Sequence, residues 1–227
     1  MSQLFDLLAS FIAVAVVLTL HEFAHAFVAY KCGDPTAKWS GRMTLNPLKH
    51  FDLTGILCFA LVGFGWAKPV PINPNNFKKY RAGCVWTSIA GILMNFLTAF
   101  LFFPIYQLLW RAYIAAPNFF LDFLWYVGYL LFAYSLSFCV FNLLPFYPLD
   151  GFRVIEAVDR RRGKVYRFLR NYGYYILLFL IVESFICDFF VRLGVYQTGY
   201  FDILGYVMQF ATKYVGWPIT ALWGLVF

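Results

Sequence analysis

The feature that most constrains this chain is an apolar run from Leu4 to Tyr30, which is long enough to cross a membrane as one helix. Three ionisable side chains, His21, Glu22 and His25, lie inside it in the pattern H-E-x-x-H. Burying such groups among apolar residues is costly, so ionisable residues in a membrane helix are candidates for a functional site. Histidines four residues apart share one helix face, and both imidazoles can therefore reach one metal ion.

The same run is too long for the core of a signal peptide and lacks a basic leader, so we expect it to be retained. The chain is 62% hydrophobic and only 13% charged, whereas soluble domains are about one quarter charged. We therefore expect an all-α polytopic membrane protein with about six transmembrane helices. It should form a single membrane-embedded domain over residues 1–227, with a core at 4–170 and C-terminal helices at 171–227.

The basic residues are concentrated in two blocks. Fifteen of the 18 Lys and Arg residues fall within 31–82 and 153–170. The positive-inside rule places both blocks in the cytoplasm and the N-terminus outside, as expected for a multi-pass protein of the cell (inner, cytoplasmic) membrane. The formal net charge of +7 is thus explained by topology and by contact with anionic membrane lipids, and we expect no nucleic-acid partner. Five cysteines without C-x-x-C spacing argue against a thiolate zinc cluster.

Other apolar stretches predict further helices over 83–110, 120–144, 174–193 and 201–227. Residues 34–82 are different, because they contain five prolines and a short apolar insert at 53–66. Irregular backbone at membrane depth must pack against protein or line a wet cavity. We therefore predict a re-entrant or β-hairpin element between the first and second full spans.

Two histidines do not complete a hydrolytic zinc site, which has three protein ligands and an open position. The candidates for the third ligand are His50, Asp52, Asp150, Glu183 and Asp188. Asp150 is favoured because Pro145 and Pro148 break the preceding helix and Gly151 allows close approach. Asp150 precedes the charged run that begins at Asp159 by nine residues, and His25 and His21 precede Lys31 by six and ten. The three side chains can therefore share one depth in the membrane. A helix-capping role is the alternative for Asp150.

Taken together, these motifs resemble the site-2 protease family of zinc intramembrane proteases. The H-E-x-x-H set at 21–25 is followed by N-x-x-P-x-x-P-L-D-G at 142–151, and the resemblance covers about residues 4–170. It implies one Zn²⁺ per chain, held by His21, His25 and Asp150, with Glu22 as the catalytic base. Residues 91–96 are similar to the family's G-P-x-x-N motif, with isoleucine in place of proline. The chain has no room for a PDZ or CBS module, so it resembles a minimal member.

The resemblance implies a zinc-dependent endopeptidase that hydrolyses transmembrane protein substrates near the cytoplasmic side, as in regulated intramembrane proteolysis. Asn95 and Asn142 are expected to bind substrate, while the oligomeric state is left open. The alternative is a non-proteolytic membrane metal-binding regulator or a metal transporter. A transporter should have polar groups through both leaflets, whereas here they cluster near one side. A proteolytically inactive regulator usually lacks the glutamate, and Glu22 is present.

Overall fold

The computed structural model describes residues 3–62 and 65–226, and within them the chain is helical apart from turns and extended loops. No β-strand occurs in these residues; Phe51 and Ala67 form an isolated antiparallel bridge. In chain order the elements are α1 (Gln3–Cys32), α2 (Thr36–Trp39), η1 (Pro47–Lys49), α3 (Leu53–Val62), η2 (Pro74–Asn76), α4 (Tyr80–Ala115), α5 (Phe119–Leu143), α6 (Asp150–Val158), α7 (Lys164–Arg192), η3 (Tyr196–Phe201) and α8 (Ile203–Trp223).

Four helices in the described part of the chain are long and apolar enough to cross a membrane: α1, α4, α5 and α7. The first three match the predicted spans to within about five residues at each end, whereas α7 begins at Lys164 instead of near Tyr174. The predicted boundary at residue 170 therefore falls inside a helix. The helix α8 covers most of 201–227 but does not meet the same criteria, since Gln209, Thr212 and Lys213 interrupt its apolar sequence. The expected total of six spans is not confirmed.

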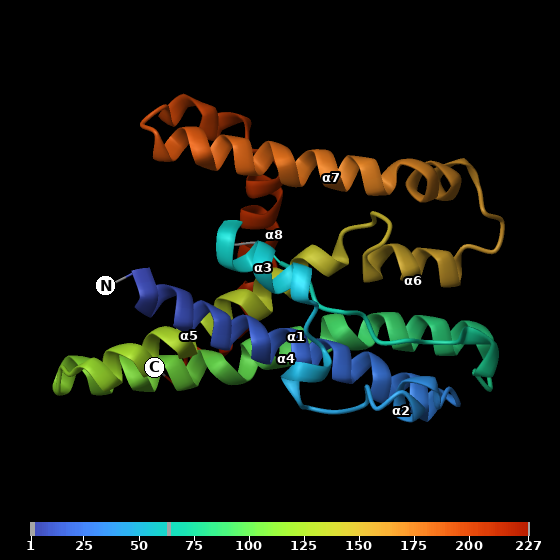
Figure 1. The fold of residues 1–227 in the computed structure, drawn as a ribbon, viewed down its shortest axis with the longest axis horizontal. Helices are drawn as coiled ribbons and strands as arrows, with labels where there is room; N and C mark the ends of the chain where they lie inside the picture. The colour runs from blue at the N-terminus through green and yellow to red at the C-terminus, as the bar shows by residue number, and fades with distance from the viewer. Residues whose placement is uncertain (1–2, 63–64, 227) are drawn as a thin grey trace.

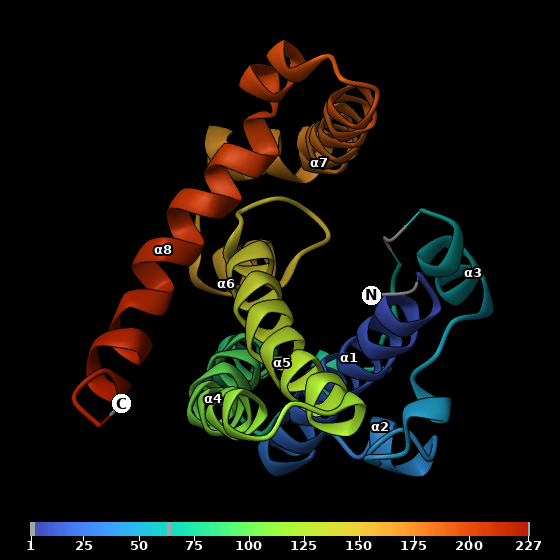
Figure 2. The same cartoon turned by 90° about the vertical axis from the view of Figure 1, so that its left-hand side faces the viewer.

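The helices α1, α4 and α5 pack together into one layer (Figures 1 and 2). Their contact is close because α1 presents small residues to its neighbours, as is typical of helix pairs in membranes. One buried cluster joins α1 to α5 and consists of Ala9, Ala13, Val17, Leu130 and Leu131. This layer positions the H-E-x-x-H motif directly against α4.

The helix α7 stands apart from this layer, with η3 folded back along it (Figure 2). Its main contacts are with η3, α8 and α6. The helix α8 then crosses back to the layer, where Ile219 is fully buried against α4 and α5. Near the end of α8, the Trp223 Nε1–H donates a hydrogen bond to the Phe100 carbonyl at 3.0 Å. We refer to α7, η3 and α8 as the C-terminal arm.

The insert after the first span is a short helix, α3, and not a β-hairpin among the described residues. Asp52 precedes it, and its carboxylate accepts hydrogen bonds from the backbone N–H groups of Thr54 and Gly55 at 3.0 and 3.1 Å. Such capping favours a helix start. After the insert the chain returns to Ala67, which pairs with Phe51 just before α3. The two ends of the insert therefore lie side by side. Its re-entrant placement in a membrane stays a prediction.

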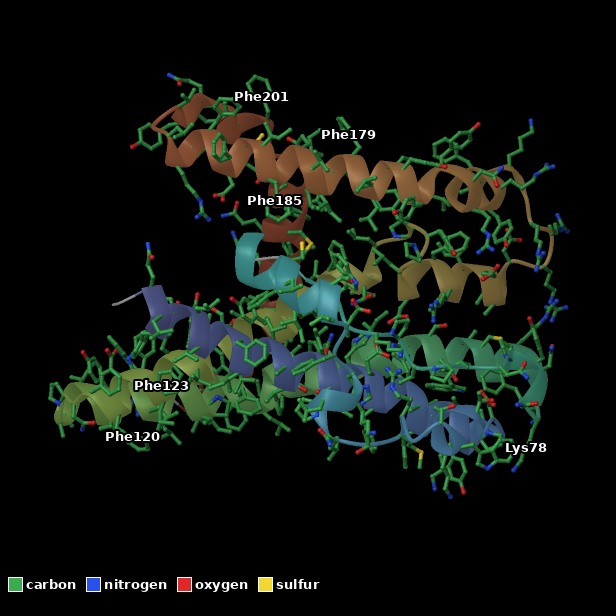
Figure 3. The ribbon with its side chains drawn as sticks, in the orientation of Figure 1. Lys78, Phe120, Phe123, Phe179, Phe185 and Phe201 are labelled. Carbon is green, nitrogen blue, oxygen red and sulfur yellow. The ribbon has the colours of Figure 1, made fainter. Side chains whose placement is uncertain are left out.

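The two ends of the layer differ in chemistry. Figure 3 shows Lys78 at one end and Phe120 and Phe123 at the other. At the aromatic end, the Phe5 ring lies with its centroid 5.2 Å from that of Phe123. The loop between α6 and α7, which contains Arg160, Arg161 and Arg162 of the second basic block, lies at the same end as Lys78 (Figure 1). Which end faces the cytoplasm stays a prediction.

Candidate metal centre

Three side chains from two distant parts of the chain converge inside the layer. His21 and His25 lie one turn apart on α1, and Asp150 is the first residue of α6. The His21 Nε2 and His25 Nε2 atoms are 2.9 Å apart, and the Asp150 Oδ2 atom lies 3.3 and 3.0 Å from them. All three residues are at most 7% exposed. In the described residues, this is the one group of three His, Cys, Asp or Glu side chains that could hold a metal ion.

The donor set fits a zinc ion. Zinc bonds of about 2.0–2.2 Å in a tetrahedral site place ligand atoms roughly 3.4 Å apart, close to the separations seen here. Asp150 Oδ2 is buried and makes no hydrogen bond of good geometry among the described residues, where its neighbours are the Nε2 atoms of His21 and His25. A buried carboxylate oxygen without a donor is unfavourable unless a cation is present. Two imidazole nitrogens and one carboxylate oxygen leave a fourth position for water or substrate, as in hydrolytic zinc sites.

Partners from α4 orient the two imidazoles. The Thr87 carbonyl lies 2.7 Å from His25 Nδ1, so it can accept the Nδ1–H and direct Nε2 into the centre. The Asn95 side-chain nitrogen lies 3.0 Å from His21 Nδ1, and Asn95 Oδ1 has no partner among the described residues. When the Asn95 amide is turned by 180°, its Oδ1 atom faces the ring and accepts the His21 Nδ1–H. Each histidine thus has an outer partner.

Gly91 lies between these two partners and permits the close approach of α4. Thr87, Gly91 and Asn95 are spaced four residues apart, so all three share the face of α4 that meets α1. A Cβ atom at Gly91 would lie closer than 3.0 Å to atoms of both His21 and His25. Any other residue here would have to displace the imidazoles.

Glu22 is held beside the centre by the extended segment 67–73. Its Oε2 atom accepts a hydrogen bond from the Val70 N–H at 2.8 Å. Val70 is buried against Ala26 of α1 and Ala37 of α2, which anchors the segment to the helix that presents the motif. The glutamate is therefore fixed by one carboxylate oxygen, and its other oxygen accepts no hydrogen bond from the residues that the structure describes.

The loop after α1 anchors the same segment at its far end. The Asp34 carboxylate accepts hydrogen bonds from the Asn73 N–H at 2.7 Å and from the Asn76 side chain at 2.8 Å, as well as from Thr36. Burial by itself would raise the pKa of Asp34, but the hydrogen bonds from Thr36, Asn76 and Asn73 hold that pKa below its usual value. Segment 67–73 is thus tied to α1 at Glu22 and to the loop after α1 at Asp34.

Two cavities of different character reach the centre. The larger, of about 510 Å³, includes His25 in its wall and is otherwise lined by α4, α6, segment 69–77 and the loop after α6. The other, of about 320 Å³, includes His21 and Glu22 and is lined mostly by apolar side chains of α1 and α5 together with residues 65–67. One imidazole therefore faces each cavity. Asn142 lines the apolar cavity, and its side chain donates to the Phe138 carbonyl at 3.1 Å.

The other candidates for the third ligand lie away from the centre. His50 is fully buried with Nε2 2.8 Å from the Thr44 carbonyl, and Asp52 caps α3. On α7, Asp188 pairs with Arg192 at 2.8 Å, and Glu183 contacts Cys187. Leu149 occupies the N-cap position of α6 and Asp150 is the first residue of the helix, so Asp150 is not placed as its cap. The roles of Asn95 and Asn142 towards substrate stay predictions.

Two groups at the centre were not anticipated from the sequence, the Thr87 carbonyl and the Val70 N–H. Both are backbone groups. Every residue has a carbonyl and every residue except proline has an N–H, so the identity of the side chain contains no signal for them. Gly91 did belong to a motif noted in the sequence, but its contact with both imidazoles depends on how α4 crosses α1.

The fold and the centre define a class: a helical protein with four helices long and apolar enough to cross a membrane, among the described residues, and a buried His-His-Asp group suited to a metal ion. Comparison with curated proteins agrees with this class. The chain is 43% identical over 177 residues to the "Putative zinc metalloprotease YwhC" of Bacillus subtilis (strain 168), covering 75% of this chain and 78% of that protein. It therefore belongs to the same family as YwhC, whose members are named as zinc metalloproteases.

Mycobacterial proteins are also similar. The "Putative zinc metalloprotease Rip2" of Mycolicibacterium smegmatis is 28% identical over 216 residues, covering 92% of this chain and 78% of Rip2. The protein of the same name from Mycobacterium tuberculosis (strain ATCC 25618 / H37Rv) is 32% identical over 180 residues, covering 74% of this chain and 62% of that relative. No protein-family model matches the chain, and no solved structure does.

Proposed function

We propose that this protein is an intramembrane zinc endopeptidase of the site-2 protease type, which cleaves transmembrane protein substrates near the cytoplasmic face of the cell membrane. The observation on which the proposal rests is the convergence of His21, His25 and Asp150 beside Glu22, with the histidines and the glutamate on a helix apolar enough to span a membrane. In this proposal, the end of the molecule with Lys78 faces the cytoplasm and the N-terminus lies outside.

His21, His25 and Asp150 would hold the zinc ion, with the Thr87 carbonyl and Asn95 keeping both Nε2 atoms directed at it. When bound, zinc supplies Lewis acidity that activates water and polarises the scissile carbonyl. Glu22 accepts the proton of the attacking water on its free carboxylate oxygen and passes it to the leaving amine. The Val70 N–H holds the other oxygen and so aims the carboxylate.

The two cavities support a path for the substrate. A transmembrane segment would enter on the apolar side, past Leu18 and Phe138, and its unwound chain would pass the centre into the polar cavity beside His25. Asn142, in the wall of the apolar cavity, is placed to hydrogen-bond the unwound backbone. A metal transporter would need polar groups on both sides of the centre, and the apolar lining of one cavity favours the protease.

The test is the isosteric Glu22→Gln variant in purified protein. We expect it to keep the zinc content of the wild type, because Glu22 is not among the metal donors, and to lower cleavage of a single-span substrate by about 10²–10⁴-fold. Metal analysis and a gel-based cleavage assay give the two readouts. Glu183→Gln, the same chemical change on α7, is the control and should retain cleavage. Wild-type cleavage by Glu22→Gln would contradict the mechanism.

A further inference from the structure

The polar cavity has a rim of arginines that the proposed chemistry does not use. Four guanidinium side chains line it: Arg81 at the start of α4, Arg153 on α6, and Arg160 and Arg162 in the loop that follows. The volume of about 510 Å³ is in the range of ligand pockets in general. The arginines belong to both basic blocks of the sequence, so the fold brings the blocks together around one opening.

The acidic side chains in the same wall do not neutralise these arginines. Glu156 accepts a hydrogen bond from the Tyr166 hydroxyl at 2.8 Å and pairs with Arg170 at 3.9 Å. Asp159 accepts hydrogen bonds from the backbone N–H groups of Arg161 and Gly163. The Glu156 carboxylate therefore binds side chains of α7, and the Asp159 carboxylate binds the backbone of its own loop.

The guanidinium groups of Arg81, Arg153 and Arg160, by contrast, form no hydrogen bond or ion pair with a side chain among the described residues. Arg162 lies over the Tyr166 ring, with its guanidinium carbon 5.5 Å from the ring centroid. The cavity therefore has an excess of positive charge, with donors free to bind an anion. Guanidinium groups are well suited to carboxylates, because their planar N–H groups can bind both oxygens.

The cavity joins these arginines to the metal centre. Thr87, whose carbonyl meets His25, lies six residues after Arg81 on α4, or about 9 Å along the helix axis. Asp150 precedes Arg153 by three residues on α6, or about 4.5 Å along its axis. An extended peptide advances about 3.3 Å per residue, so the rim lies roughly one to three residues from a bond cleaved beside His25.

From this arrangement we infer that the cavity is a specificity subsite for acidic side chains of the substrate, one to three residues beyond the cleaved bond on the basic side of the molecule. The inference deepens the proposed function and rests on it. The occupant is a peptide and not a lipid headgroup, because His25 lines the same cavity, so the proposed substrate chain passes through it and a bound lipid would obstruct that chain. General topology control does not require the arginines to line a cavity that leads to the centre.

The experiment measures binding separately from cleavage. Full-length protein with Glu22→Gln, which leaves the cavity wall unchanged, is reconstituted in neutral phosphatidylcholine vesicles. It is titrated with fluorescent single-span peptides that differ only at the three positions beyond the cleavage site, which are Asp, Asn or Lys. We expect the Asp peptide to bind about fivefold or more tightly than the Asn peptide, and the Lys peptide to bind most weakly. The preference should fall as salt is raised.

The variants locate the effect. Added to Glu22→Gln, the paired change Arg81→Gln with Arg153→Gln should remove the preference for Asp while leaving affinity for the Asn peptide within about twofold. The control is Arg161→Gln, which removes one positive charge from the loop after α6 at a residue that does not line the cavity. It should keep the preference. Because all three arginines are exposed, these changes should not unfold the protein.

Equal affinity for Asp and Asn peptides would overturn the subsite and leave the protease function untouched. An affinity change that follows the phosphatidylglycerol content of the vesicles, and not the charge of the peptide, would also overturn it in favour of a lipid site. If Asp peptides bind preferentially but wild-type protein with bound zinc cleaves none of the peptides, a binding site for acidic peptides is supported, whereas the proposed protease function fails and the role as a cleavage subsite fails with it.

Discussion

The layer of α1, α4 and α5 and the C-terminal arm are both apolar, yet they are packed very differently. In the most apolar windows of α1, α4 and α5, 39–44% of residues are buried, whereas the corresponding fraction in α7 is 11%. The layer is built on small residues such as Ala9, Ala13 and Ala99, all fully buried. The helix α7 presents large side chains outward, including Tyr175 and Phe179.

The difference explains where a metal centre can form. Holding three ligand atoms at separations of 2.9 to 3.3 Å requires helices that approach closely and outer partners that limit each side chain. Small residues on α1 and Gly91 on α4 permit that approach. The exposed faces of α7 place no such restraint on their side chains, so polar groups there form local pairs instead.

The largest contrast between the two regions should come from two aspartates. Asp150→Asn keeps the side-chain size but removes the charge of the carboxylate, so we expect zinc to be lost and cleavage to fall below detection. Asp188→Asn breaks an exposed pair with Arg192 on α7, and such pairs contribute at most about 1 kcal/mol. Metal analysis and thermal unfolding of both variants make the comparison. Wild-type zinc content in Asp150→Asn would remove Asp150 from the ligand set.

A second, smaller contrast concerns glycines. Gly91→Ala introduces a Cβ against both imidazoles, and we expect a loss of about 10–100-fold in zinc affinity, the range seen when the surroundings of metal ligands are disturbed. Gly163→Ala, just before α7, is the matched change, because a Cβ there meets no atom within 4 Å among the described residues. Competition with a chelator measures both affinities. Equal affinities would show that α4 can shift away from α1 at little cost.

The smallest contrast concerns capping and loop aspartates. Asp34 is fully buried and accepts four hydrogen bonds, so Asp34→Ala should lower the free energy of unfolding by about 2–3 kcal/mol. Asp202→Ala removes a hydrogen bond to the Gly205 N–H at the start of α8 and should cost about 1 kcal/mol. Chemical denaturation in detergent would compare them. A greater loss with Asp202→Ala would contradict the ranking.

The Asp34 contribution should also depend on pH. Its pKa is lowered in the folded protein, so its stabilisation is fully present above the unfolded pKa of about 3.9 and is lost as pH falls through the folded value. The stability difference between wild type and Asp34→Ala should therefore be constant from pH 7 to about 5 and shrink at lower pH. A difference that grows on acidification would contradict the direction of the pKa shift.

Much of the layer could be predicted from the sequence, because each of its helices is a long apolar run whose limits are set by charged residues or proline. The helical form of the insert at 53–62 was not predicted, since a short apolar run has no periodicity that distinguishes helix from strand. The start of α7 was also missed. Its first residues are basic, so the helix begins before the apolar part of the sequence on which the prediction was based.

The sequence by itself determined that several helices are apolar enough to cross a membrane, because this depends only on length and composition. It also determined the two histidines that can share a metal, because helical periodicity fixes the spacing of residues on one helix. Only the tertiary structure decided that Asp150 reaches them, that Thr87 and Val70 contribute backbone groups, and that arginines far apart in sequence line one cavity. The physical reason is that contacts between helices depend on how closely they pack, and that packing depends on every small residue along the interface.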